Sequence, residues 1–131
     1  HPSGCDFDGR CRRRSPHPLM CGLAGFLGFP VPAPAVPDLL ARMAGTLVHR
    51  GPDDQGIWRD PSAGVGFAHR RLSVQDLSPL GAQPMRSASG RFVIAYNGEV
   101  YNFPALRAEL SARGHSFRGG SDTEVMLAAF E

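Results

Sequence analysis

A cysteine close to the start of the chain, Cys21, directly follows Met20 and precedes a glycine. If translation began at Met20, removal of that methionine would leave a free α-amino group on the residue that carries the thiol. An α-amine has a pKa of about 7.7–8.0, so it can accept the proton of its own side chain and activate the thiol as a nucleophile. The alternative is a structural cysteine buried at the start of a strand, which position alone favours.

Other side chains that commonly bind metals show no metal-site pattern. The three cysteines have no Cys-x-x-Cys spacing, which argues against a zinc site and a disulfide framework. His49, His69 and His115 are not at ligand spacing, and no His-Glu-x-x-His motif occurs. Residues 119–122 differ from an ATP-pyrophosphatase loop because the serine follows the glycines and no buried strand precedes them. We therefore expect no metal and no cofactor in this chain.

The composition is that of one folded domain. Across 131 residues, 42% are hydrophobic and 20% are charged, which excludes disorder for most of the chain. The formal net charge is only +2, so a basic nucleic-acid-binding surface has no support. Twelve prolines interrupt the apolar runs, and no 18-residue apolar segment remains that could span a membrane.

Short apolar segments predict the strands that would position Cys21. Residues 22–29 resemble a buried strand, and further strands are expected at 57–59, 64–70 and 91–96. Asn97-Gly98 lies between two apolar runs, and Asn-Gly is the strongest short signal for a β-hairpin. Strands thus follow strands, with helices inserted singly, which is typical of the α+β class.

Three helices are expected between and after these strands. The first runs from Pro37 or Asp38 to about Val48. One face of it would carry Leu39, Leu40, Met43 and Leu47. The second spans about 103–113 and would be capped by Asn102. The third opens with a capping-box pattern, Ser121-Asp-Thr-Glu124.

Residues 1–20 have no periodicity and contain an arginine cluster. One interpretation is a secretory signal, with CRRRSPHP as basic region, LMCGLAGFLGF as apolar region, APA as cleavage site and an arginine pair of twin-arginine type. The glycines within 22–28 and the prolines before them argue against it. We expect residues 1–20 to be an extension that is removed or that precedes the true start. Residues 21–131 would be one domain, truncated within its last helix.

Five segments, in order, resemble the N-terminal glutaminase domain of glutamine-hydrolysing asparagine synthetases, which is a class II (Ntn-type) glutamine amidotransferase. They are MCGLAGFLG, HRGPDDQG, GFAHRRLSVQDLSPLGAQPM, FVIAYNGEVYNFPALRAEL and GGSDTEV. The similarity covers residues 20–131 without a large gap. The HRGPD and RLS-x-x-D-L motifs favour the asparagine synthetase branch over glucosamine-phosphate synthase and amidophosphoribosyltransferase.

The resemblance implies a fold and a catalytic apparatus. The fold would be an Ntn-hydrolase four-layer αββα sandwich, with two antiparallel sheets between helices, incomplete here. Cys21 would attack the side-chain amide of L-glutamine and form a γ-glutamyl thioester, while its own α-amine relays protons. The Asn97 side-chain amide and the Gly98 backbone N–H would form the oxyanion hole. For Asn97-Gly98 alone, a plain hairpin turn is the favoured interpretation, and the two interpretations are compatible.

The resemblance also implies how glutamine is bound. Arg71 would bind the α-carboxylate as a bidentate partner, with the backbone of the residues that follow it completing that wall. These residues are Leu72, Ser73, Val74 and Gln75. Glu99 and Asp122 would hold the α-ammonium group. Asp122 has a competing explanation in the helix dipole, and an isolated charged residue is most often simply solvated.

The implied function is release of ammonia from glutamine for a C-terminal synthetase domain of the same chain. That domain would use ATP and Mg²⁺ to make asparagine from aspartate. The expected compartment is the cytoplasm, and a homodimer is a possible assembly of the protein. One alternative is a catalytically silent structural module that only packs against its partner domain. Another is the same glutaminase serving a different ATP-dependent amidation in secondary metabolism.

Overall fold

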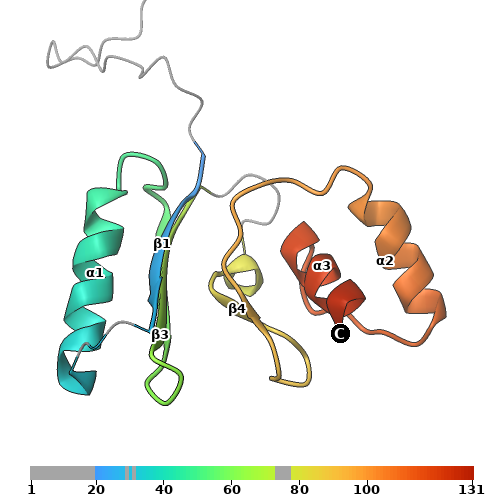
Figure 1. Cartoon of the computed structure of the whole chain (residues 1–131). Coiled ribbons are helices and arrows are strands. Elements are labelled where there is room, and N and C mark those ends of the chain that lie inside the picture. The colour runs from blue at the N-terminus through green and yellow to red at the C-terminus, as the bar shows by residue number, and fades with distance from the viewer. Residues whose placement is uncertain (1–19, 29, 31, 73–77) are drawn as a thin grey trace, which may run out of the picture.

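The computed structural model describes residues 20–28, 30, 32–72 and 78–131. Within these residues the chain forms two small antiparallel sheets and three α-helices (Figure 1). The α+β class expected from the sequence is therefore confirmed.

The larger sheet has the strand order β1-β3-β2. Its strands are β1 (Gly22–Leu27), β2 (Asp54–Asp60) and β3 (Val65–Arg71), and both pairings are antiparallel. Each strand lies within a few residues of its predicted position. Gly22 pairs with Arg70, so Cys21, one residue earlier, comes to lie at the end of β3.

Helix α1 (Val36–Thr46) packs on one face of this sheet. Its buried residues Val36, Leu40 and Ala44 are four positions apart and contact Ala68 on β3. The helix fits closely because β3 carries small residues there. A Cβ added at Gly66 would lie 3.1 Å from the Leu40 side chain and 2.7 Å from the Phe26 ring.

The predicted apolar face of α1 is only partly correct. Leu40 and Met43 do belong to the core or pack against it. Leu39 and Leu47 instead line a shallow groove beside β1 and are only half-buried. The helix is turned toward the small residues of β3, since close packing there buries Val36 and Ala44 completely or nearly so.

The second half of the chain lies on the side of the sheet opposite α1 (Figure 1). It contains the hairpin of β4 (Met85–Arg86) and β5 (Val93–Ile94), followed by α2 (Phe103–Ala112) and α3 (Asp122–Phe130). Helix α3 contacts both α2 and β4. The larger sheet thus has α1 on one side and the second half of the chain on the other (Figure 1).

The hairpin predicted at Asn97-Gly98 is wrong. Strand β5 ends at Ile94, where residues 91–96 were expected to be strand, and its partner β4 precedes it in the chain. Gly98 is not among the glycines with positive φ that a two-residue hairpin turn of this type needs. The local Asn-Gly signal is overridden by tertiary contacts, because side chains from other elements hold the backbone on both sides of it, at Tyr96 and at Val100.

The ends of the helices agree partly with the predicted caps. Ser121 caps α3, since its hydroxyl accepts the Glu124 N–H at 3.3 Å. The Glu124 carboxylate accepts from the N–H groups of Arg118 and Gly119, which fixes the loop before the helix. Asn102 is the N-cap residue of α2, as predicted, but its side chain makes no capping hydrogen bond.

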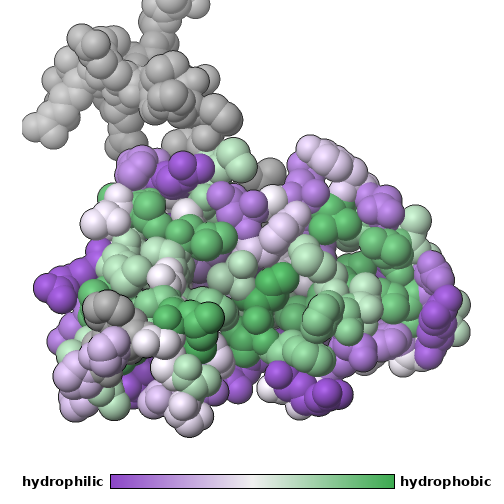
Figure 2. Space-filling view, in the orientation of Figure 1, coloured by the Kyte–Doolittle hydropathy of each residue, from purple (hydrophilic) through white to green (hydrophobic). Residues whose placement is uncertain are grey.

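Apolar side chains also reach the surface. In the orientation of Figure 1, the space-filling view shows apolar surface across the middle of the molecule and more polar surface at its edges (Figure 2). On β1, Leu27 is 81% exposed and Leu23 is 47% exposed. No helix in the described part of the chain is long and apolar enough to cross a membrane.

Candidate active site

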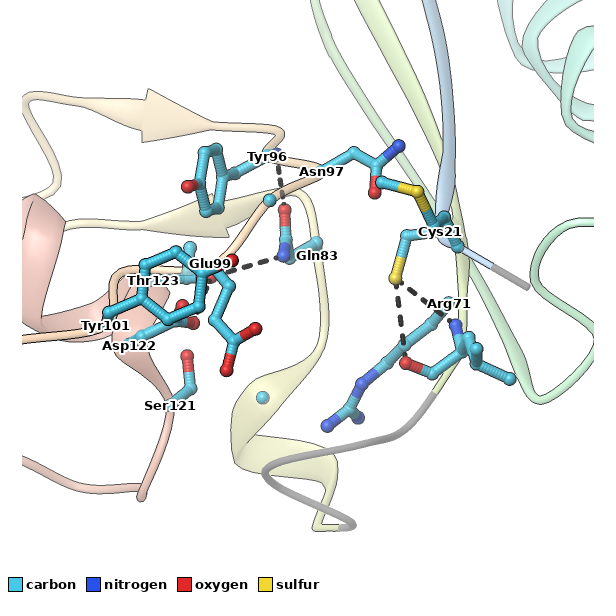
Figure 3. Close-up of a pocket in the computed structure, with 14 residues that line it drawn as sticks. Cys21, Arg71, Gln83, Tyr96, Asn97, Glu99, Tyr101, Ser121, Asp122 and Thr123 are labelled. Carbon is cyan, nitrogen blue, oxygen red and sulfur yellow. Dashed lines mark hydrogen bonds between the residues drawn. The ribbon is translucent and has the colours of Figure 1, made fainter. Parts of the chain in front are cut away.

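A cavity of about 400 Å³ lies between the Cys21 end of the larger sheet and the start of α3 (Figure 3). This volume lies in the range of small-molecule binding sites. Every predicted site residue that the structure describes lines it: Cys21, Arg71, Leu72, Asn97, Gly98, Glu99 and Asp122. Ser73, Val74 and Gln75 lie outside the described residues. The fold therefore gathers side chains that are up to about a hundred positions apart in the sequence, while their roles stay predictions.

Cys21 lies at the wall of the cavity, just before β1. Its side chain is half-buried, and the backbone N–H of Leu72 donates to Sγ at 3.3 Å. The thiol in turn donates to the Leu72 carbonyl over 3.6 Å. Met20 also lines the cavity, so the residue that precedes the nucleophile candidate occupies part of the site.

Arg71 places a positive charge in the same cavity. It is only 8% exposed, and its Nη1 donates to the Ser78 carbonyl at 2.9 Å. No carboxylate of the described residues lies within ion-pairing distance of it. The preceding residue, Arg70, points to the opposite side of the strand, where its Nε donates to Gly51 O at 2.8 Å. A buried guanidinium is stabilised by an anion, so Arg71 is suited to bind one.

Asn97 and Gly98 form the part of the cavity wall opposite the strands. Figure 3 shows the Asn97 side-chain amide pointing toward the side on which Cys21 lies. A Cβ at Gly98 would lie 2.5 Å from the Tyr96 hydroxyl oxygen. A side chain at this position would displace the neighbouring tyrosine ring, which favours glycine here.

Two acids lie across the cavity from Arg71 (Figure 3). Asp122 is buried at the first turn of α3, and its Oδ2 accepts the Val100 N–H at 2.9 Å. Glu99 lies on the segment between Asn97 and Val100 and is exposed to the cavity opening. The helix dipole explains part of the position of Asp122, as expected. A positive wall and a negative wall therefore face each other, which suits a zwitterionic amino acid.

Sequence reasoning missed several residues of the cavity wall. These are Gly81, Gln83, Tyr96, Tyr101, Ser121 and Thr123. Gln83 is the most informative, because its Oε1 accepts the Tyr96 N–H at 2.6 Å and its Nε2 donates to Thr123 Oγ1 at 3.3 Å. Gln83 lies near the end of one of the five resembling segments, GFAHRRLSVQDLSPLGAQPM, but neither its residue type nor its spacing indicates these contacts.

A buried histidine, His69, lies on β3 behind the cavity wall. It is 1% exposed, and its Nε2 lies 3.2 Å from the Tyr96 carbonyl oxygen. Burial lowers the pKa of His69 below its ordinary 6.5, and the Arg71 charge acts in the same direction. The contact with Tyr96 and the Asp54 charge oppose this shift. Among the described residues no group of three or more His, Cys, Asp or Glu side chains could hold a metal ion.

Comparison with known proteins identifies the family. The family model of the glutamine amidotransferase domain matches residues 20–131. Asparagine synthetase [glutamine-hydrolyzing] 3 of Bacillus subtilis (strain 168) is 42% identical over 113 residues, which are 85% of this chain and 18% of the relative. Asparagine synthetase B [glutamine-hydrolyzing] of Escherichia coli (strain K12) is 38% identical over 112 residues, 86% of this chain and 20% of the relative. An amidase of Gibberella zeae, chry2, is 35% identical over 121 residues, 86% of this chain and 18% of the relative.

The chain belongs to the glutamine amidotransferase domain family, since the family model covers nearly all of the residues from Met20 onward. It spans no more than a fifth of the length of these relatives.

Proposed function

We propose that this chain is a glutaminase domain that hydrolyses L-glutamine to glutamate and ammonia. The observation that carries the proposal is that one cavity has Cys21 and Arg71 on one wall and two acids on the opposite wall. These acids are Glu99 and Asp122. A thiol can serve as the nucleophile in amide hydrolysis, and a buried cation and two acids can bind the charged end of a free amino acid.

Glutamine would be oriented by its charged end. Its α-carboxylate would pair with Arg71, and its α-ammonium group would pair with Glu99 and Asp122. The backbone of Leu72, together with Ser73, Val74 and Gln75 outside the described residues, would complete the carboxylate-binding wall. The side-chain amide would then extend toward Cys21.

The chemistry would proceed through a thioester. Sγ of Cys21 bonds to the amide carbon, and the π electron pair of the carbonyl moves onto its oxygen. The Asn97 amide and the Gly98 N–H donate to that oxyanion. The Cys21 α-amine, which has accepted the thiol proton, passes it to the leaving nitrogen, and the C–N bond breaks to release ammonia. Water then attacks the thioester, which yields glutamate and restores the thiol.

This mechanism requires Cys21 to be the first residue of the active protein. A peptide bond at its nitrogen would remove the lone pair that accepts the proton. Because Met20 also lines the cavity, its removal would free the amine and enlarge the site at the same time. We therefore assign the active domain to residues 21–131 and its continuation, without residues 1–20.

The ammonia would serve a synthetase domain of the same protein, which converts aspartate to asparagine with ATP and Mg²⁺. The names of the Bacillus subtilis and Escherichia coli relatives support this, as does the small share of their length that the chain spans. The complete glutaminase domain would be a four-layer αββα sandwich, to which the described sheets and helices contribute. The cytoplasm is the proposed compartment, because a cysteine nucleophile must stay reduced.

The proposal is tested by replacing Cys21 in the full-length protein. Cys21→Ala should abolish glutamate release from glutamine, while synthesis with added ammonia continues. The product formed with aspartate, compared with other acids, identifies the acceptor. Glutamate release by Cys21→Ala at the wild-type rate would contradict the proposal.

A further inference from the structure

The backbone of Tyr96, the residue directly before Asn97, is held at both of its polar groups by side chains. Its N–H donates to Gln83 Oε1 at 2.6 Å, and its carbonyl oxygen lies 3.2 Å from His69 Nε2. No regular strand holds this segment, since β5 ends at Ile94. These two side chains therefore do what a strand partner would otherwise do.

The two anchors connect the segment to different walls of the cavity. His69 lies on β3, two residues before Arg71, so both side chains leave the same face of the sheet. Gln83 donates in turn to Thr123 Oγ1, beside Asp122 at the start of α3. The Tyr96 peptide is thus tied to the wall that carries Arg71 and to the wall that carries Asp122.

We propose that His69 and Gln83 are positioning residues of the glutaminase site: they fix the Tyr96 peptide so that the Asn97 amide and the Gly98 N–H face Cys21. This inference rests on the proposed function. His69 does not line the cavity, so it acts through the backbone of Tyr96 and not on the substrate. Gln83 does line the cavity, but both of its amide atoms are engaged by protein groups.

The hydrogen bonds require His69 to be a donor through Nε2, because a carbonyl oxygen only accepts. In the neutral ring that donates from Nε2, Nδ1 keeps a lone pair, and Nδ1 has no partner among the described residues. Asp54 and Arg71 are the charged groups that act on the ring. A neutral, buried donor suits a fixed support, since it neither gains nor loses a proton during turnover.

Displacing the oxyanion-binding groups should lower kcat more than it changes KM. Their charged partner exists only after the thiol has attacked, so the bound ground state loses little. A misplacement of about 1 Å can lower the rate about 100-fold. We therefore expect kcat to fall about 10- to 100-fold when either anchor is removed, with KM for glutamine within about threefold of wild type.

The test uses four variants of the full-length protein in a glutamate-release assay. His69→Leu and Gln83→Met remove the hydrogen bonds, while His69→Gln keeps an N–H donor near the position of Nε2. Ser87→Ala is the matched control, because it removes partly buried hydrogen bonds to Phe92 in the β4–β5 hairpin and to Glu131 after α3, away from the cavity. We expect low kcat in the first two variants, substantial recovery in His69→Gln and wild-type kcat in Ser87→Ala.

Three results would overturn the inference. The first is wild-type kcat in Gln83→Met and in those His69 variants that fold. The second is a change in KM alone in these variants, and the third is an equal loss of kcat in His69→Gln and His69→Leu. A changed pH profile of kcat in His69→Gln would also overturn it, since a fixed donor should not titrate during turnover. If the wild-type protein itself released no glutamate, the proposed function would be contradicted, and the two failures can be told apart in this way.

Discussion

Replacement of Arg71 by alanine tests the substrate-binding part of the site. Arg71 is 8% exposed, lines the cavity and has no carboxylate of the described residues within ion-pairing distance. The charge that the account assigns to it is the α-carboxylate of glutamine. Arg71→Ala should therefore weaken the use of glutamine while leaving the use of added ammonia intact, because ammonia has no carboxylate.

The size of the effect follows from the burial of this side chain. Removing one partner of a buried, hydrogen-bonded charge pair costs about 2–5 kcal/mol, part of which is the charge left unpaired. At about 1.4 kcal/mol per factor of ten, kcat/KM for glutamine should fall about 30- to 4,000-fold. Arg71→Lys should fall between the alanine variant and wild type, because it keeps the charge but loses the planar pair of donors.

The assay compares glutamate release with ammonia-dependent synthesis in the same preparation. Arg70→Ala is the matched control, because Arg70 precedes Arg71 on β3 and its side chain contacts Gly51 and Gln55, away from the cavity. The melting temperature of each variant reports any loss of the Ser78 contact of Arg71. Glutamine kinetics of Arg71→Ala that match those of Arg70→Ala and wild type would refute the reasoning.

Two further perturbations act on other parts of the site. Asn97→Ala should lower kcat about 100- to 1,000-fold, equivalent to about 2.7–4 kcal/mol, and leave KM nearly unchanged. Steady-state glutaminase kinetics measure both constants. A change in KM alone would show that Asn97 is not part of the oxyanion hole. The pKa of His69 is lowered by burial, so between its native pKa and 6.5 the unfolded chain binds a proton that the native protein does not. The free energy of unfolding should therefore fall as the pH drops below about 6.5, and denaturant titrations of His69→Gln should show a weaker dependence over that range.

The sequence was sufficient for the residues whose positions follow from local strand patterns. Cys21 precedes an apolar segment and Arg71 ends another, and antiparallel pairing of β1 with β3 brings the two together. Asp122 follows from the capping serine at position 121, which starts α3 where the pattern indicates. Local signals thus indicated the ends of these elements, while the assignment of the three side chains to one site came from the resemblance of the ordered motifs to the glutaminase family.

The supporting contacts could not be predicted, because they join segments that have no local relation. The His69–Tyr96 and Gln83–Thr123 contacts span 27 and 40 positions along the chain. The failure at Asn97-Gly98 has the same origin, since a short-range turn signal competes there with side chains from β3 and from the segment before β4. The face of α1 was misjudged because the helix follows the small residues of β3, which its own sequence does not contain.

The central claim is that Cys21 acts on glutamine through its own free α-amine, and it is tested most directly by comparing two forms of the full-length protein. One begins at Cys21, as intact-mass measurement verifies, and the other retains Met20 because further residues are fused before it, which leaves Cys21 itself unchanged. Both are treated with glutamine and with the glutamine-analogue electrophile diazo-oxonorleucine. The account predicts glutamate release and labelling of Cys21 only in the form that begins at Cys21. Equal turnover and labelling in the form that retains Met20 would contradict it.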